Sequence, residues 1–441
     1  MSHVRRPHSG QASVLLVALV ASMVACFAVA FSAGQLVNDK MRLMNAADAA
    51  AYSAAVWEAR SLNFQSYMNR AIVANEVALA QLVSLRSWSR YVSTATSNGA
   101  RVAQYIPALA GPIRTLAQGW RAVDATLQST LPALEASLST WNVTVLANAQ
   151  GVAHQQASIV AADLVTEVAR RNEPRAQVTN ATRLLEGRNA ALWQNHFTDR
   201  YRRGGGDLQR FSTLLMDSRD GFTRSRRASL PIPLPLLDIS RRGGTDLIAE
   251  GTWRGVDTLS AHLDLLLASI EVPIGWGAAE QQHVPVARRG QHGGSLSRNP
   301  TASRLALRAL RPSRAYRGLP EIRDIITPSR RDDRTLRYAV ALSMPAASIQ
   351  TADRLLMPTG ITSPDGLQHS LAPDLAGDAI HSLGAAEVYF RRPEPRADGR
   401  REYPSLFNPY WHARLVDVSG QERALTAPMR GLTVDPFSVS P

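Results

Sequence analysis

An uncharged apolar run near the N-terminus constrains this chain more than any other feature of its sequence. From Ala12 to Phe31 there is no charged residue, proline or glycine. A helix of that length rises about 30 Å, which matches the hydrocarbon layer of a bilayer. We therefore predict one transmembrane helix over residues 12–33, preceded by a basic tip, residues 1–11, in the cytoplasm.

Two other interpretations of the run compete with a retained span. A cleaved signal peptide has an apolar region of about 7 to 15 residues that ends at an A-x-A-like site, and Ala28-Val29-Ala30 fits such a site. The second competing interpretation is a buried core helix of a soluble protein. Against cleavage, the run is long and its helical pattern continues past Gly34 to Met44. We expect a retained anchor and keep a secreted form as the alternative.

Charged residues predict the orientation of the span and a bacterial origin. Arg5 and Arg6 precede the span, and positive residues favour the cytoplasmic side, although Lys40 and Arg42 follow the span beside Asp39. Arginine supplies nearly all of the net charge of +13, a bias typical of GC-rich bacterial genomes. We therefore expect a single-pass protein of the bacterial inner membrane with the bulk of its chain in the periplasm.

Small residues recur at every fourth position of the span. They are Ser22, Cys26, Ala30 and Gly34. Such a seam lets a second transmembrane helix approach closely, so it is a candidate packing surface, although alanine-rich spans also occur without partners. Because Cys26 is the only cysteine, the chain forms no intrachain disulfide and no multi-thiolate zinc site.

Two short motifs flank the span in a distinctive order. Gly10, Gln11 and Ala12 open it, and Asn45, Ala46, Ala47 and Asp48 begin an alanine-rich stretch after it. In this order and spacing, the N-terminal region resembles the TadE/TadG-like proteins of the Tad (Flp) pilus-assembly system. The resemblance implies an envelope protein, a structural or assembly component of such a pilus or a related secretion system. Its implied partners are other pilus-assembly or secretion membrane proteins.

The resemblance has two departures. TadE-type pseudopilins are similar to prepilins in carrying a glutamate five residues after the cleavage glycine, whereas Leu15 stands there in this chain. The chain is therefore closer to the TadG side of the family. Larger TadG relatives often carry a von Willebrand A metal motif, Asp-x-Ser-x-Ser, which neither Asp238 nor Asp417 completes. No metal-dependent adhesion site is expected.

Apolar periodicity predicts that residues 34–200 form an extracytoplasmic helical region. Residues 41–97 contain no proline or glycine and continue the span as one long helix. Further segments, such as Ile113 to Leu127 and Ile159 to Arg170, are expected as antiparallel helices joined by turns at prolines and glycines, Pro132 and Gly151 among them. The polar side chains of the long helix, such as Gln65, Asn69 and Glu76, are either solvated or part of an interface.

The rest of the chain is expected to contain little helix. We predict that residues 201–334 are an arginine-, glycine- and proline-rich connecting region, loop-rich from Gly275 to Arg334, in which Asp207 and Asp246 each cap a helix after a glycine turn. Residues 335–441 are predicted as a small α+β region. Its antiparallel strands are expected at Tyr338 to Met344, Ala385 to Phe390 and Tyr410 to Val418. The predicted fold class is mainly α with this small α+β part.

A basic segment suggests one binding function. Residues 288–337 hold thirteen arginines and four acids, 13 − 4 = +9. The candidate anion-binding loop comprises Arg288, Arg289, Arg304, Arg308, Arg311, Arg314 and Arg317. In the secreted alternative, a periplasmic binding protein holds an anionic partner there; a solvated loop is the simpler interpretation. Nucleic acid is not expected, because Tyr316 is the one aromatic residue in that series.

Motifs for catalysis are missing from the sequence. There is no H-E-x-x-H, G-x-S-x-G or S-x-x-K, and the ten histidines are scattered. We therefore predict no catalytic, metal or cofactor-binding residues, no enzyme activity and no small-molecule substrate. An envelope enzyme of a new kind would require a deep pocket with converging titratable groups.

Overall fold

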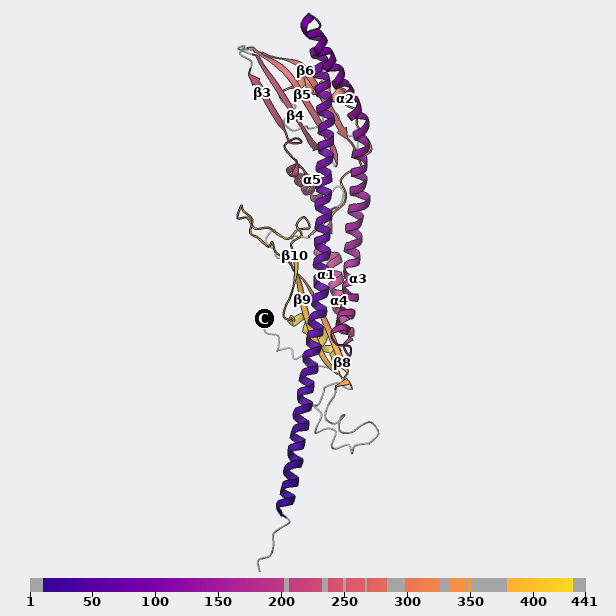
Figure 1. Cartoon of the computed structure of the whole chain (residues 1–441), viewed down its shortest axis with the longest axis vertical. Helices are drawn as coiled ribbons and strands as arrows, with labels where there is room; N and C mark the ends of the chain where they lie inside the picture. The colour runs from indigo at the N-terminus through magenta and orange to yellow at the C-terminus, as the bar shows by residue number, and fades with distance from the viewer. Residues whose placement is uncertain are drawn as a thin grey trace, which may run out of the picture.

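The computed structural model is organised around one helix, α1 (Gln11–Ala103), which runs along most of the molecule (Figure 1). Its 93 residues extend over about 140 Å at the rise of an α-helix. The predicted long helix and its continuity with the apolar run are therefore confirmed. The structure describes residues 11–201, 206–231, 237–248, 251–265, 268–283, 298–325, 334–345, 348–349 and 379–430.

A second helical layer lies antiparallel to α1. It consists of α2 (Pro107–Thr140), the π-helical turn η1 (Trp141–Leu146) and α3 (Ala147–Asn172), which follow one another without a break. The expected turns at Pro132 and Gly151 are wrong, because both residues lie inside helix. Packing against α1 holds this layer: Ser61 Oγ donates to the carbonyl of Ala153 at 3.3 Å, for example.

A four-stranded antiparallel sheet packs on the half of α1 nearer the apolar run, and we call it the proximal sheet. Its order is β1 (Gln177–Val178), β8 (Leu336–Pro345), β9 (Ala379–Phe390) and β10 (Trp411–Leu415). The three predicted C-terminal strands are confirmed. β9 meets α1 at Gly384, where a Cβ atom would lie 2.5 Å from the carbonyl carbon of Ala47. Only glycine permits so close an approach.

A second four-stranded antiparallel sheet, the distal sheet, packs on the other half of α1 (Figure 1). Its strands follow chain order: β3 (Arg226–Pro231), β4 (Leu237–Ile248), β5 (Thr252–Leu265) and β6 (Ala268–Gln281). A glycine again makes the closest contact, since a Cβ at Gly277 would lie 2.2 Å from the carbonyl oxygen of Ser87.

The distal sheet lies within residues 201–334, where the sequence predicted a connecting region and no strands. Asp207 does lie in the first turn of a helix, α5 (Gly206–Ser218), but Asp246 lies in strand β4 and caps nothing. Glycine and aspartate disfavour an isolated strand, yet here Gly243 leaves room for the Asp257 carboxylate, which pairs with Arg226 at 2.6 Å. Tertiary packing therefore overrides local propensity in this region.

Shorter elements complete the fold. They are α4 (Asn180–Leu192), η2 (Trp193–Phe197), β2 (Thr198–Arg200), α6 (Pro300–Arg308), β7 (Arg323–Ile325), α9 (Gly420–Thr426) and η4 (Ala427–Arg430). β2 pairs antiparallel with β7, and α6 covers β5 and β6. The predicted class, mainly α with small antiparallel sheets, is confirmed, whereas the domain boundaries stay predictions.

Three polar side chains of α1 lie in an internal interface and are not solvated. Gln65, Asn69 and Glu76 are fully buried. Asn69 Nδ2 donates to the carbonyls of Arg323 and Leu406 at 2.8 and 2.7 Å, and so holds strand β7 and the segment around Leu406 against α1. The polar residues of α1 therefore fix where the other elements dock.

Candidate functional site

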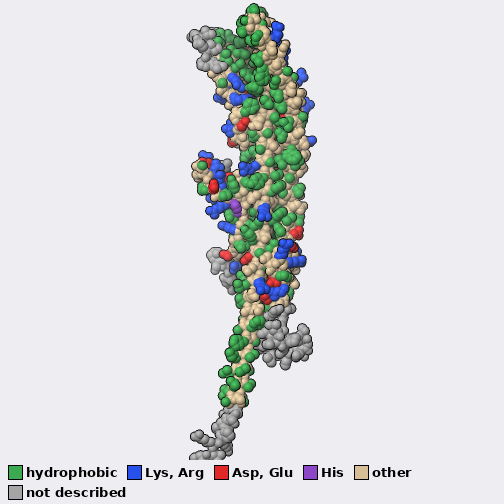
Figure 2. Space-filling view, in the orientation of Figure 1, with side chains coloured by type: hydrophobic (Ala, Val, Ile, Leu, Met, Phe, Trp, Pro, Cys, Tyr) green, Lys and Arg blue, Asp and Glu red, His purple; other side chains and the backbone are tan. Residues whose placement is uncertain are grey.

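The apolar run forms a protruding, unpacked end of α1. Val14, Leu15 and Val17 are 71%, 71% and 68% exposed, and the most apolar stretch has no buried residue. Figure 2 shows this narrow, largely hydrophobic stem below the packed body. The helix is long and apolar enough to cross a membrane. It is therefore a candidate transmembrane helix in which exposed apolar side chains would face lipid.

The small-residue seam lies on this exposed end. Ser22, Cys26, Ala30 and Gly34 are all exposed, and a Cβ at Gly34 would meet nothing within 4 Å. Ser22 Oγ donates to the carbonyl of Ala18 at 2.8 Å, so the hydroxyl is satisfied within its own helix. The seam is open for another helix to approach, and its role in helix packing stays a prediction.

The alanine motif has a structural role where α1 enters the body. Ala46 and Ala47 are fully buried, and Ala47 is the residue that Gly384 of β9 approaches. Asn45 is exposed, and Asp48 is half-buried, which raises the pKa of its carboxyl. Of the opening motif, Ala12 is exposed, Gln11 begins α1, and Gly10 lies outside the described residues. Small side chains at this point let strand and helix touch.

An ion-pair network fastens the same end of the body. Arg175, just after α3, pairs with Asp39 of α1 at 2.7 Å and with Glu173 at 2.8 Å. Hydrogen bonds from Arg175 lower the pKa of Glu173. Both carboxylates are nearly buried, so the guanidinium ties α3 to α1 where α1 leaves the body.

The predicted anion-binding arginines do not form one loop. Arg304 and Arg308 are exposed on helix α6, whereas Arg311, Arg314 and Arg317 are exposed on the extended segment after it. Arg317 contacts α2, since its backbone N–H donates to Ser139 Oγ at 2.9 Å. Arg288 and Arg289 lie outside the described residues. Anion binding by these arginines stays a prediction.

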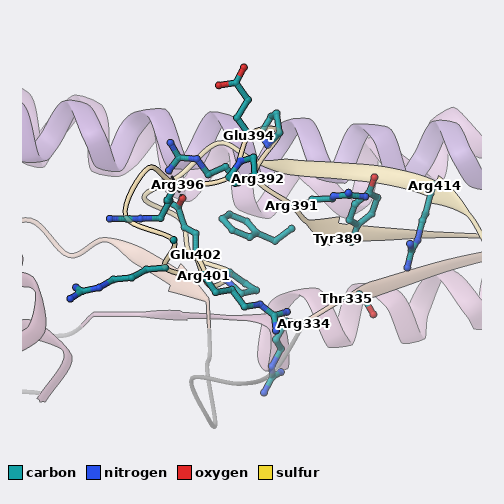
Figure 3. Close-up of a pocket in the computed structure, with 16 residues that line it drawn as sticks. Arg334, Thr335, Tyr389, Arg391, Arg392, Glu394, Arg396, Arg401, Glu402 and Arg414 are labelled. Carbon is teal, nitrogen blue, oxygen red and sulfur yellow. Dashed lines mark hydrogen bonds and ion pairs between the residues drawn. The ribbon is translucent and has the colours of Figure 1, made fainter.

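A different group of arginines surrounds a cavity of about 660 Å³, which we call the arginine pocket. Its basic lining residues come from the β9–β10 connection, from β10 and from the segment before β8 (Figure 3). They are Arg334, Arg391, Arg392, Arg396, Arg400, Arg401 and Arg414. Two glutamates, Glu394 and Glu402, also line it, so the balance is 7 − 2 = +5.

The β9–β10 connection, residues 391–410, holds the pocket in shape. It closes at its base, where the backbone N–H of Arg391 donates to the carbonyl of Tyr410 at 2.9 Å. At its tip, Asp398 pairs with Arg396 at 2.8 Å and accepts from the backbone N–H of Arg400 at 3.2 Å. These hydrogen bonds, that from Arg396 foremost, lower the pKa of Asp398 to about 2. Asp398 therefore stays charged at neutral pH.

Ring stacking and ion pairs orient several of these guanidinium groups. Arg392 pairs with Glu402 at 2.7 Å and lies 5.6 Å from the ring centre of Tyr410. Arg414 pairs with Glu387 and lies 4.8 Å from the ring centre of Tyr389. Chemically, such a set of fixed planar donors recognises carboxylates or phosphates.

Sequence reasoning missed this pocket because acidic residues lie between its arginines along the chain and keep the local net charge low. Residues 391–402 contain five arginines and three acids, 5 − 3 = +2, which gives no strong signal. Arg334 and Arg414 reach the cavity only because β8 and β10 flank β9 in the folded sheet. An arginine- and proline-rich hairpin connection between two predicted strands was the available clue.

Metal and catalytic sites were not expected, and the described ranges contain no group of three or more His, Cys, Asp or Glu side chains that could hold a metal ion. The absence of enzyme activity stays a prediction. His154 is buried beside Trp193, with ring centres 5.1 Å apart, and burial lowers its pKa to about 3. It is a neutral core residue at physiological pH.

Comparison with known families supports the N-terminal resemblance. Residues 10–57 match the family model described as putative Flp pilus-assembly TadE/G-like. The match covers the candidate transmembrane helix and the alanine motif, and it ends within the part of α1 that packs on the proximal sheet. Neither the curated proteins nor the solved structures gave a match.

Proposed function

We propose that this chain is a single-span inner-membrane protein that serves as a structural or assembly component of a Tad/Flp-type pilus or a related secretion system. One observation carries the proposal: the family match coincides with an apolar, unpacked helix end that continues unbroken into the folded body. In this arrangement, the span fixes the protein in the membrane and α1 extends both sheets away from it.

The span and α1 together set the reach of the body. From Ala33 to Ala103, α1 rises about 105 Å at 1.5 Å per residue. If Arg5 and Arg6 stay in the cytoplasm, the body stands in the periplasm as a rod along the membrane normal. A rod of this kind suits a scaffold that contacts partners at several heights. Other membrane proteins of the assembly would approach the seam of Ser22, Cys26, Ala30 and Gly34.

Membrane retention is tested with matched arginine substitutions at the two ends of α1. Val20→Arg with Val24→Arg places two charges in the span, each costing about 2.5 to 3.5 kcal/mol at a helix centre. Val102→Arg is the control, because Val102 is an exposed valine of the same helix, 68% exposed, outside the span. We expect alkaline carbonate to release the double variant, while the wild type and the control stay in the membrane fraction.

Protease treatment of spheroplasts tests the orientation. The body should be digested from outside, and residues 1–11 should be protected. A wild-type protein in the soluble fraction, with its mature N-terminus near Phe31, would instead support the secreted binding protein. Loss of pili on deletion of the gene, restored by the wild type and not by the double variant, tests the assembly role. Normal piliation of the deletion strain would contradict it.

A further inference from the structure

We propose that the arginine pocket binds an acidic polypeptide segment of a partner protein through its carboxylates. The inference goes beyond the proposed function, because it concerns a cavity outside the matched N-terminal region; only its choice of a peptide over lipid headgroups rests on the proposed membrane anchor. It rests on four observations: which arginines lack acidic partners, how the others are held, what else lines the cavity, and how far the cavity lies from the span.

Two pocket arginines have unmatched charge. Arg392, Arg396 and Arg414 each pair with a carboxylate of the chain. In contrast, Arg391 and Arg400 are exposed, and no carboxylate of the described residues forms an ion pair with either. Glu394 does not neutralise them, since its carboxylate points away from the other labelled side chains in Figure 3. The pocket therefore offers guanidinium groups for an anion from outside.

Ring stacking orients three of the other pocket arginines. Arg414 stacks over Tyr389, Arg392 over Tyr410, and Arg401 over Tyr403 at 5.9 Å. A guanidinium that is already oriented loses less conformational freedom when it binds a ligand. Spacing several fixed cations around one cavity favours a ligand with several anionic groups over a single free anion.

The remaining lining suits a peptide. Apolar atoms of Phe390, Pro393, Pro395 and Pro404 contribute to the cavity wall alongside the arginines. A volume of about 660 Å³ accommodates several side chains, and sites for organic ligands are typically about 300 to 1,000 Å³. The wall can pack against the methylene groups of glutamate or aspartate side chains while the arginines bind their carboxylates.

The distance of the pocket from the membrane favours a peptide ligand over lipid headgroups. β10 is fixed to α1 by Asn63, whose Nδ2 donates to the carbonyl of Trp411 at 2.9 Å. Asn63 lies thirty residues beyond Ala33, so it stands about 45 Å from the end of the span along α1. Headgroups of the anchoring membrane cannot reach the β9–β10 connection at that height. A protein segment that extends alongside the rod can reach it.

The test measures binding of fluorescein-labelled hexaglutamate to the full-length, detergent-solubilised protein by fluorescence anisotropy. Arg391→Ala with Arg400→Ala removes the two unmatched charges, and we expect the affinity to fall at least tenfold. Arg114→Ala with Arg121→Ala is the control, because it removes the same charge from two exposed arginines of α2. We expect that variant to bind like the wild type, and labelled hexaglutamine not to bind.

The lysine variant and competitors complete the test. Arg391→Lys with Arg400→Lys keeps the charge and loses the planar fork, so an intermediate affinity is expected. Unlabelled hexaglutamate should displace the probe at concentrations where inorganic phosphate, glycerol phosphate and hexathymidylate do not. Equal weakening by the pocket and α2 variants would overturn the proposal, as would wild-type binding by the pocket variant. Displacement by phosphate, glycerol phosphate or hexathymidylate at the peptide's concentration would also overturn it, in favour of that ligand.

Discussion

The two halves of α1 use different chemistry to hold similar sheets. The proximal half packs a dense set of alanines against apolar strand residues. These are Ala46, Ala47, Ala50, Ala51, Ala54 and Ala55 on α1, with Val340, Leu342, Ala386 and Val388 on the strands. The distal half buries charged and hydroxyl groups instead, and these find partners across the interface. One long helix thus shows that a sheet can be held either by small apolar side chains or by polar groups that pair across the interface.

Ion pairs and hydrogen bonds define the distal interface. Asp257 of β5 accepts hydrogen bonds from Ser87 of α1 and from Arg226 of β3. Glu76 is fully buried, and Trp253, Tyr316 and Asn142 donate to it at 3.0, 2.6 and 2.9 Å. Burial raises the pKa of both carboxyls, against these favourable contacts. Such networks specify one arrangement, because every wrong docking leaves buried polar groups unpaired.

The largest expected effect comes from Glu58 of α1, a fully buried carboxyl group in the mostly apolar proximal half. Burial outweighs the neighbouring Asn189 amide and raises the pKa of Glu58 from 4.5 to about 8. The folded protein therefore retains a proton that the unfolded chain loses above pH 4.5. The free energy of unfolding should fall by about 1.4 kcal/mol per pH unit, or roughly 5 kcal/mol between pH 4.5 and 8. Glu58→Gln should remove this dependence.

Urea unfolding of the detergent-solubilised wild type and variant at pH 5, 6, 7 and 8 measures the difference. Because the other titratable groups are common to both proteins, only the change in slope reports on Glu58. Parallel pH profiles for the two proteins would contradict a protonated, buried Glu58.

Breaking a buried ion pair between the helices is expected to have the next largest effect. Arg86 of α1 and Glu135 of α2 pair at 2.9 Å, with side chains 5% and 0% exposed. Arg86→Met leaves Glu135 buried without its cation, which should lower the free energy of unfolding by about 3 to 5 kcal/mol. Adding Glu135→Leu should recover much of that loss.

A surface pair provides the control for Arg86. Arg171 and Glu167 pair at 2.7 Å but are 77% and 56% exposed. Arg171→Met should change the free energy of unfolding by less than about 1 kcal/mol. Equal effects of Arg86→Met and Arg171→Met in the same urea experiment would refute the distinction between buried and exposed pairs.

The next prediction concerns the size of the side chain at position 384, where β9 contacts the proximal half of α1. A Cβ at Gly384 would lie 2.5 to 2.6 Å from backbone atoms of Ala47 and Asp48, which cannot move aside as a side chain can. Gly384→Ala should therefore lower the free energy of unfolding by about 1 to 3 kcal/mol. Gly119→Ala is the control, since Gly119 lies in α2 with nothing within 4 Å of an added Cβ, and it should be neutral or stabilising. A neutral Gly384→Ala, measured by urea unfolding, would show that the strand can move.

The smallest expected effect concerns one hydroxyl pair of the distal interface. Ser84 of α1 and Thr245 of β4 are fully buried, and their hydroxyls lie 2.6 Å apart. Thr245→Val keeps the shape and leaves Ser84 without this partner, so the free energy of unfolding should fall by about 1 kcal/mol or somewhat more. Ser84→Ala with Thr245→Val should be closer to the wild type. A double variant that loses the sum of both single effects would show no coupling between the hydroxyls.

Local patterns were enough to predict part of the fold. The apolar run, the helix over residues 41–97 and the strands of the C-terminal part each repeat their apolar residues at the period of their own element. The strands β4 to β6 could not be predicted this way. They contain glycine and aspartate, which disfavour strands. The reasons for those residues are the α1 backbone beside Gly277 and the ion pair of Asp257 with Arg226 of the neighbouring strand β3.

The candidate sites divide in the same way. By itself, the sequence determined the apolar run and the motif from Asn45 to Asp48, because length, hydropathy and spacing are properties of contiguous residues. Only the tertiary structure decided that Arg334 and Arg414 join the arginines of residues 391–401 around one cavity. It also decided that Glu76 and Asp257 are buried. Burial and charge convergence arise when remote segments pack together, and no stretch of contiguous residues encodes that contact.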